Sequence, residues 1–525
     1  MTEHNVSTSS TSDDHLARTI GRNTMFGIVA GLAQVGTRLI TVPIAIAHLG
    51  LDGYGIWSII MTTAAYMRFG SVGIKSAFQK YVAEATGSGD YARANRLLST
   101  GTTVMFVISI VGLVPIAIYS PALARLTGVP DLFLDSTARA FLLLALIMVL
   151  SNVGAGYEAI VMGGHRIDLT RKFSTAFTVL EAVFIVGVLH YGYGLLAMAT
   201  VMAVSEIGYV ACCFVASRMV LPQVRINPAL CAVGVLRELF VFAGSYQLVN
   251  VLEVLYGAIL PFTVLKFFGA HATGVYAVAG RLITAALLAQ DAFLIPILSG
   301  GAMIAASASP ERMQLLLTKS FKATLALALL PLAFIASNGS SMILAWTGQA
   351  DPSFTPTLWI LCLGALFKSI SMLELVLYRA LGRAWMDNIR QVLRIAVLVA
   401  VSMLGRSLGF YGVLWALAVA EFVGMVFMFF ALISSFHGFK ARRLVPETAK
   451  LCLATACVML AGVLAARAPV PWAVSERMLA VLRLIGVGLL TGAAIWPALI
   501  LTGSLSGGES RAILGVFTRK VGASA

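Results

Sequence analysis

Long apolar runs alternate with short polar segments along almost the whole chain. Each run has about 20 residues, the length that an α-helix needs to cross a hydrocarbon layer of roughly 30 Å. The pattern predicts an all-α polytopic membrane protein with about 14 transmembrane helices. Their approximate ranges are 23–48, 54–73, 98–119, 137–162, 173–191, 194–217, 240–265, 272–300, 323–338, 357–378, 391–405, 411–435, 451–467 and 479–502.

A short element follows both the first and the seventh predicted helix. The stretch HLGLDGYGIW begins at residue 48, and FFGAHATGVY begins 219 residues later. Both hold the pattern Gly-x4-Gly-x-aromatic, which is typical of a tight turn with an aromatic residue at the membrane interface. The same offset aligns further pairs, namely Arg93 with Arg312, Gly163 with Gly382 and Arg171 with Arg390, while a slip of one residue aligns Gly194 with Gly412. This shared offset indicates an internal duplication.

The duplication predicts two repeats of six helices each. Because six is even, both repeats enter the membrane from the same side, so we expect two parallel lobes related by an axis along the membrane normal. Two extra C-terminal helices lie outside the duplication. The predicted segments are a disordered cytoplasmic tail (1–22), an N-lobe (23–217), a cytoplasmic linker (218–239), a C-lobe (240–435), the two extra helices with their connecting loops (436–502) and a second cytoplasmic tail (503–525).

Charge then fixes the expected orientation. The chain is 59% hydrophobic, with a formal net charge of +14 and a mean hydropathy of +0.91. Most of the 37 Lys and Arg residues fall in loops on one side, which the positive-inside rule assigns to the cytoplasm, together with both termini. The positive charge therefore indicates contact with anionic membrane lipids, and we expect no nucleic acid partner.

Several polar residues lie deep inside the predicted helices. An ionised side chain at mid-bilayer costs roughly 2.5–3.5 kcal/mol, so such groups usually face a cavity or a partner. We expect a water-filled cleft between the lobes with a cationic, substrate-binding lining. Its candidate residues are Arg38, Arg281, Arg68, Gln34, Asn250 and Lys368, and the candidates for coupling to an ion are Glu253 and Asp291.

Each of these assignments has a structural alternative. Arg281 could pair with Asp291 or Glu253 as a helix-packing salt bridge, and Arg38, Arg68 and Lys368 could pair locally or extend toward the interface. For Glu181, Glu206 and Glu421 we favour polar contacts between helices.

Enzyme signatures are missing from the sequence. There is no P-loop and no dinucleotide fingerprint, and the histidines lack metal-ligand spacing. We therefore expect no enzymatic activity, no metal and no cofactor.

Three stretches together with the duplication resemble a known superfamily. The LGLDGYGIW turn, the basic YARANRLL loop and the GGHRIDLTRK loop look like the multidrug/oligosaccharidyl-lipid/polysaccharide exporter (MOP) superfamily, and within it like the Wzx-type flippases of O-antigen and exopolysaccharide synthesis. The resemblance implies alternating-access transfer of undecaprenyl-diphosphate-linked oligosaccharide from the inner to the outer leaflet of the bacterial cytoplasmic (inner) membrane. Polysaccharide polymerases and glycosyltransferases are the implied protein partners.

The number of helices resembles a second branch. Fourteen spans are typical of lipid II (peptidoglycan precursor) flippases, whose cavity arginines on helices 1, 2 and 8 correspond in place to Arg38, Arg68 and Arg281. A multidrug exporter of the same superfamily would use Glu253 and Asp291 for ion coupling, but the arginines would repel its cationic ligands. The loop motifs of major-facilitator transporters are missing from this sequence. A non-transporting scaffold would not need charged residues deep inside its helices.

Overall fold

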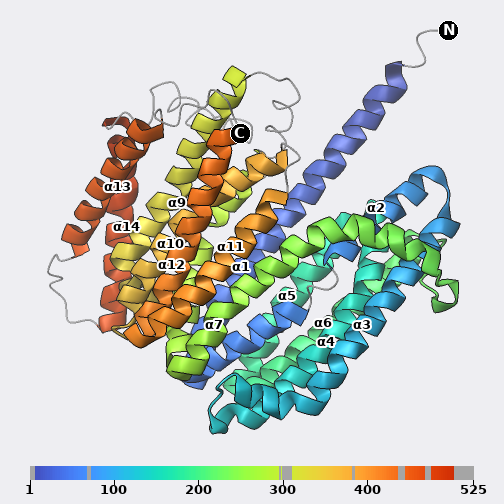
Figure 1. Cartoon of the computed structure of the whole chain (residues 1–525), viewed down its shortest axis with the longest axis horizontal. Helices are drawn as coiled ribbons and strands as arrows, with labels where there is room; N and C mark the ends of the chain where they lie inside the picture. The colour runs from blue at the N-terminus through green and yellow to red at the C-terminus, as the bar shows by residue number, and fades with distance from the viewer. Residues whose placement is uncertain are drawn as a thin grey trace. The chain divides into compact units, whose positions relative to one another are not determined.

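The computed structural model describes residues 6–67, 72–294, 297, 310–380, 385–435, 444–466 and 475–501 (Figure 1). Within these ranges the secondary structure is helical. The α-helices are α1 (Val6–Met67), α2 (Val72–Ser88), α3 (Tyr91–Leu126), α4 (Asp131–Gly163), α5 (Ile167–His190), α6 (Leu195–Val220), α7 (Leu236–Ala286), α9 (Pro310–Thr347), α10 (Phe354–Ala380), α11 (Trp385–Gly405), α12 (Phe410–Ser435), α13 (Leu444–Ala466) and α14 (Glu476–Leu501). Short 3-10 turns cover Pro228–Leu230, Val233–Val235 and Arg406–Leu408.

The predicted fold class is confirmed. In the described residues 11 helices are long and apolar enough to cross a membrane. Two of them, in α1 and α7, each contain two predicted spans that meet at a non-helical glycine. A shorter apolar helix at Thr448–Leu460 covers the thirteenth predicted span. Each of the fourteen apolar runs therefore corresponds to a helix.

The beginning of the chain differs from the expectation. α1 starts at Val6, so residues 6–22, expected to be a disordered tail, continue the first membrane helix without a break. Once a helix is nucleated, each added residue gains a hydrogen bond at little further cost, which explains why a polar segment extends it.

The described chain forms two compact units, Met1–Gly274 and Val275–Ala525. In the first unit α4 packs against α3 and α6, and α1 packs against α5. In the second unit α12 packs against α10 and α11, while α9 contacts α10, α13 and α14. Figure 1 shows the pair α13 and α14 beside α9.

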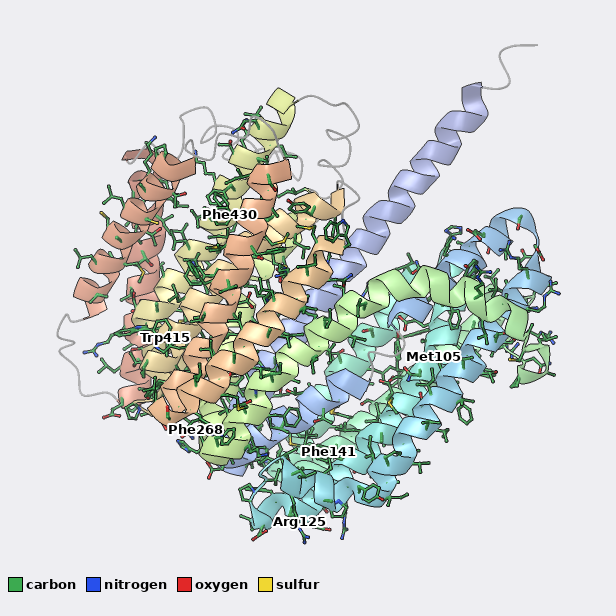
Figure 2. All side chains as sticks on the ribbon, viewed as in Figure 1. Met105, Arg125, Phe141, Phe268, Trp415 and Phe430 are labelled. Carbon is green, nitrogen blue, oxygen red and sulfur yellow. The ribbon has the colours of Figure 1, made fainter. Side chains whose placement is uncertain are left out.

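Apolar side chains divide into buried and outward-facing sets (Figure 2). Met105 on α3 and Phe141 on α4 are 3% and 0% exposed. On α12, by contrast, Trp415 is 46% and Phe430 66% exposed. In a chain with this many membrane spans, exposed apolar side chains are suited to contact with lipid.

The predicted linker folds against α3. The Asn95 side chain donates to the carbonyl of Gln223 over 3.1 Å and accepts from the backbone N–H of Arg225 over 2.8 Å. One turn further along α3, Ser99 Oγ accepts from the backbone N–H of Asn227 over 3.0 Å. Side chains of a membrane helix thus satisfy the backbone polar groups of this segment.

The two repeated turns have matching backbone geometry. Gly50 and Gly269 lie 219 positions apart, and both have positive φ, 71° and 83°. This left-handed conformation is readily adopted by glycine and breaks the helix at the turn. The equivalence supports the predicted duplication.

The second glycine of each element has a different task from the predicted one. A Cβ on Gly55 would lie 2.2 Å from the carbonyl oxygen of Ala270, and a Cβ on Gly274 would lie 2.2 Å from that of Leu51. These two contacts exchange equivalent positions of the repeats, so the glycines permit close approach of the helices that follow the two repeated turns. Trp57, expected at the membrane interface, is buried.

Candidate functional site

Two of the candidate residues lie on α1. Gln34 and Arg38 are four residues apart on one face of the membrane-spanning part of α1, Ala33–Ala64. Both side chains are exposed. A guanidinium in contact with hydrocarbon is costly, so an exposed arginine within a span is suited to a water-filled cavity.

The α7 residues continue this pattern. Asn250 and Glu253 are three residues apart on the same helical face, and both are half-buried. Arg281, further along α7 and in the second compact unit, is also half-buried. Arg68 lies outside the described residues.

Two candidates with different predicted roles come together in the second unit. The carboxylate of Asp291, a candidate for ion coupling, interacts electrostatically with Lys368 of α10, a candidate for substrate binding. Next to them, the amide of Gln290 donates to the carbonyl of Ser369 over 3.1 Å. Because Lys368 interacts with Asp291, the positive charge of the lysine is partly balanced by a carboxylate of the protein itself.

A larger polar cluster on α11 was missed by the sequence analysis. Asp387, Arg390, Gln391 and Arg394 follow the spacing i, i+3, i+4, i+7, which places them on one helical face. All four are buried, and both arginines are fully so.

The first half of this cluster joins α11 to α10. Asp387 pairs with two guanidinium groups, Arg390 at 3.1 Å and the half-exposed Arg379 at 2.5 Å. Arg390 also donates to Ser371 Oγ on α10 over 3.3 Å. One carboxylate thus lies between two cations.

The second half of the cluster joins α11 to α12. Arg394 donates to Gln391 over 2.6 Å and forms an ion pair with Glu421 on α12. Gly424 of α12 lies against the aliphatic part of Arg394, where a Cβ would come within 3.0 Å. Glu421 therefore makes the polar contact between helices that we expected, and its partner is now identified.

Glu374 completes the cluster from the α10 side. It is only 3% exposed, and Arg390 acts on it electrostatically. Its Oε2 atom is buried and has no hydrogen-bond partner in the described part of the chain. The i, i+3, i+4, i+7 spacing on α11 could have revealed this site from sequence, but its arginines lie at a predicted cytoplasmic helix end, where the positive-inside rule already accounts for them.

The first repeat uses polar contacts of a simpler kind. Glu206 on α6 accepts a hydrogen bond from Ser151 on α4, as expected for a polar contact between helices. Asn152 donates to Ser109 Oγ on α3 over 2.7 Å. Among the described residues, no group of three or more His, Cys, Asp or Glu is arranged to hold a metal ion.

Comparisons with known proteins identify the fold. No family model and no curated protein matches the chain. The lipid II flippase MurJ, solved in an inward closed conformation, matches with a TM-score of 0.68 at 14% identity over 91% of this chain and 100% of that one. An inward-facing MATE family multidrug resistance transporter of the MOP superfamily matches with a TM-score of 0.67 at 13% identity over 77% and 95%.

A third solved structure belongs to the same group. It is a MOP superfamily transporter from Pyrococcus furiosus described by a reverse polarity of its binding pocket, with a TM-score of 0.58 at 13% identity over 80% of this chain and 95% of that one. At such identities the likeness concerns the fold. The chain therefore has the fold of the transporters of the MOP superfamily.

Proposed function

We propose that this protein is a flippase that moves undecaprenyl-diphosphate-linked oligosaccharide from the inner to the outer leaflet of the bacterial cytoplasmic membrane by alternating access. The product would supply surface polysaccharide synthesis, such as O-antigen or exopolysaccharide. The observation that carries the proposal is Arg38, a cation exposed on the membrane-spanning part of α1.

The chemistry of the proposed ligand fits such an arginine. A diphosphate is a compact anion, and a guanidinium can donate two parallel hydrogen bonds to its oxygens. In the proposed mechanism Arg38 binds the diphosphate, with Arg281 a candidate for the same role, Gln34 and Asn250 contact the sugar, and the polyprenyl chain stays in the lipid. Arg68 and Lys368 are further candidates for the diphosphate.

The extent of the structural match favours a lipid-linked substrate over a drug. A match covering 91% of this chain extends beyond the residues that precede α13 and α14, because those residues make up a smaller share. That match is to a flippase of lipid II, itself a lipid-linked saccharide, which makes peptidoglycan precursor the second candidate substrate. The multidrug transporter matches over 77% of the chain, a share that does not require these helices.

Native mass spectrometry of the protein purified from its own membrane tests the proposal. We expect a co-purifying undecaprenyl-diphosphate saccharide whose mass identifies the sugar. Each of Arg38→Ala and Arg281→Ala removes a charged donor worth about 1.5–3 kcal/mol, so retention should fall roughly 10-fold to 150-fold.

Arg139→Ala is the matched control, because this exposed arginine pairs only with a surface residue of its own helix, Asp135 at 3.1 Å, in the described contacts. Equal retention by the Arg38, Arg281 and Arg139 variants would contradict a cationic substrate site. Saturable binding of a cationic drug, with loss in Glu253→Gln or Asp291→Asn, would favour the exporter alternative instead.

A further inference from the structure

The buried α10–α12 cluster differs sharply from the equivalent part of the first repeat. At the 219-residue offset, Asp387 corresponds to Asp168, which is also buried and pairs with Arg166 at 3.1 Å and Lys172 at 3.9 Å. Both repeats therefore keep a buried aspartate at the start of their fifth helix. The first repeat also keeps an arginine, Arg171, at the position of Arg390, and the two repeats diverge at the remaining positions.

The first repeat has uncharged residues at three other positions of the cluster. At the same offset, Glu374 corresponds to the buried Ala155, and Arg394 to Thr175, which bonds the backbone carbonyl of Arg171 over 2.8 Å. With the one-residue slip that aligns Gly194 with Gly412, Glu421 corresponds to Ala203. The fold itself thus does not require charged residues at these positions.

Stability does not account for the added charges either. Desolvating an ion pair costs about as much as its attraction returns, and apolar residues of similar size are often neutral or better replacements. The first repeat has the smaller, uncharged Ala155, Thr175 and Ala203 at three of these positions. A charged cluster that the fold does not need is therefore better explained by a task in transport.

The charges within the cluster leave a role for Glu374. Asp387 lies between Arg379 and Arg390, and Glu421 pairs with Arg394, so these contacts hold one more cation than anion. Ionised Glu374 would balance that cation. Protonated Glu374 would instead avoid placing a desolvated carboxylate in the helix interface. The ionised form of Glu374 is thus favoured by charge balance, and the protonated form is favoured because it avoids burying a charged carboxylate.

We propose that Glu374 binds and releases a proton that is coupled to transport, and that Arg390 transmits its charge state to the contact between α10 and α11. This inference rests on the proposed transport function. In the described residues Oε2 of Glu374 is unbonded, while Arg390 is held by Asp387 and Ser371, and the proposal assigns this arrangement to the proton-bound form. On proton release, the guanidinium of Arg390 turns toward Glu374 and its bond to Ser371 is lost.

The surroundings favour a proton over a metal cation. Guanidinium groups occupy the positions around the carboxylates, and they repel Na⁺ or K⁺. The helices packed against α10 carry these further charged groups in the described region: Lys319 and Lys322 on α9, Asp387, Arg390 and Arg394 on α11, Glu421 on α12, and Asp291, which interacts with Lys368 of α10 itself. The half-exposed Arg379 is the most exposed member of the ion pairs in this cluster.

Infrared difference spectroscopy of the full chain in lipid nanodiscs, recorded while the pH is stepped, tests proton binding without any substrate. We expect the C=O stretch of a protonated carboxyl to disappear in one step as the pH rises. Glu374→Gln should lack this change, and Glu206→Gln should keep it, because that half-buried carboxyl belongs to the first repeat. A full band change in Glu374→Gln overturns the proposal.

Two further variants separate binding from positioning and from folding. Glu374→Asp retains a carboxyl and should retain the band change, so its absence in a folded Glu374→Asp protein also counts against the assignment. Arg390→Lys keeps the charge but loses the bidentate geometry, and we expect it to shift the midpoint of the band change. An unshifted midpoint would remove Arg390 from the mechanism.

Export measurements then link the proton to transport. In cells, wild-type export of lipid-linked saccharide should slow when an uncoupler collapses the proton gradient, while the residual export of Glu374→Gln should not respond. If no saccharide is exported but the carboxyl band is present, the proposed function fails and the proton site stands. If export in both proteins responds equally, the coupling role of Glu374 is wrong.

Discussion

Glycines at the repeated turns show how two identical residues in one motif take different tasks. The spacing predicted a turn at Gly50 and Gly269, and the positive φ angles confirm it. The close approach at Gly55 and Gly274 could not be predicted, because it depends on which helix lies opposite. Deep charges such as Arg38 were recognisable from sequence because charge inside an apolar run stands out. The residues that these charges contact could not be recognised from the sequence.

Adding one methyl group at Gly55 tests the close approach. In Gly55→Ala the Cβ would meet the carbonyl oxygen of Ala270 at 2.2 Å, so the helices must separate. We expect a loss of roughly 1–3 kcal/mol in the free energy of unfolding, measured by denaturation in detergent. Gly36→Ala in the same helix is the control, because nothing lies within 4 Å of its added Cβ. Equal stability of the two variants would show that the approach is not tight.

At the scale of the elements, the helices were predictable and the polar contacts between them were not. A run of about 20 apolar residues has one physical solution in a bilayer, which is a helix. The α10–α12 cluster escaped notice because its arginines also satisfy the positive-inside rule at a helix end. A periodic polar face on α11 is the signal that distinguishes a buried cluster from a loop charge.

The ion pair between α11 and α12 gives a double-mutant prediction. Glu421→Ala leaves Arg394 as a buried charge without its carboxylate, and it should destabilise the protein by about 3–5 kcal/mol. The double variant Arg394→Thr with Glu421→Ala carries the residues of the first repeat and should recover most of that loss. Thermal unfolding in detergent measures both. A double variant no more stable than Glu421→Ala would mean that the charges are structural, against our inference.

For the whole molecule, the duplication was visible in the sequence through one offset, since repeated turns must recur at repeated positions. The contact between the two repeated turns was not visible in the sequence. Asp52 and His271 are exactly one repeat apart, and their side chains meet at 3.1 Å on an exposed surface. Equivalent residues of the two repeated turns therefore contact each other within the first compact unit.

Joining these two positions covalently tests alternating access. In an Asp52→Cys/His271→Cys variant that lacks the six native cysteines, a short thiol cross-linker should stop export, because the proposed alternating access is expected to separate the two turns. A reductant-cleavable linker should allow recovery. Single-cysteine variants treated alike are the controls. Undiminished export by the cross-linked protein would show that this contact persists through the cycle.

The meeting of Asp52 with His271 also has an evolutionary consequence. If the two repeats descend from one ancestral half that worked as a symmetric pair, the residue at this position would have faced its own copy across the axis. A like charge would then have opposed itself, and no single substitution could have made the two sides complementary. Only after the ancestral gene was duplicated, so that the two copies could change independently, could the position hold an acid on one side and an imidazole on the other.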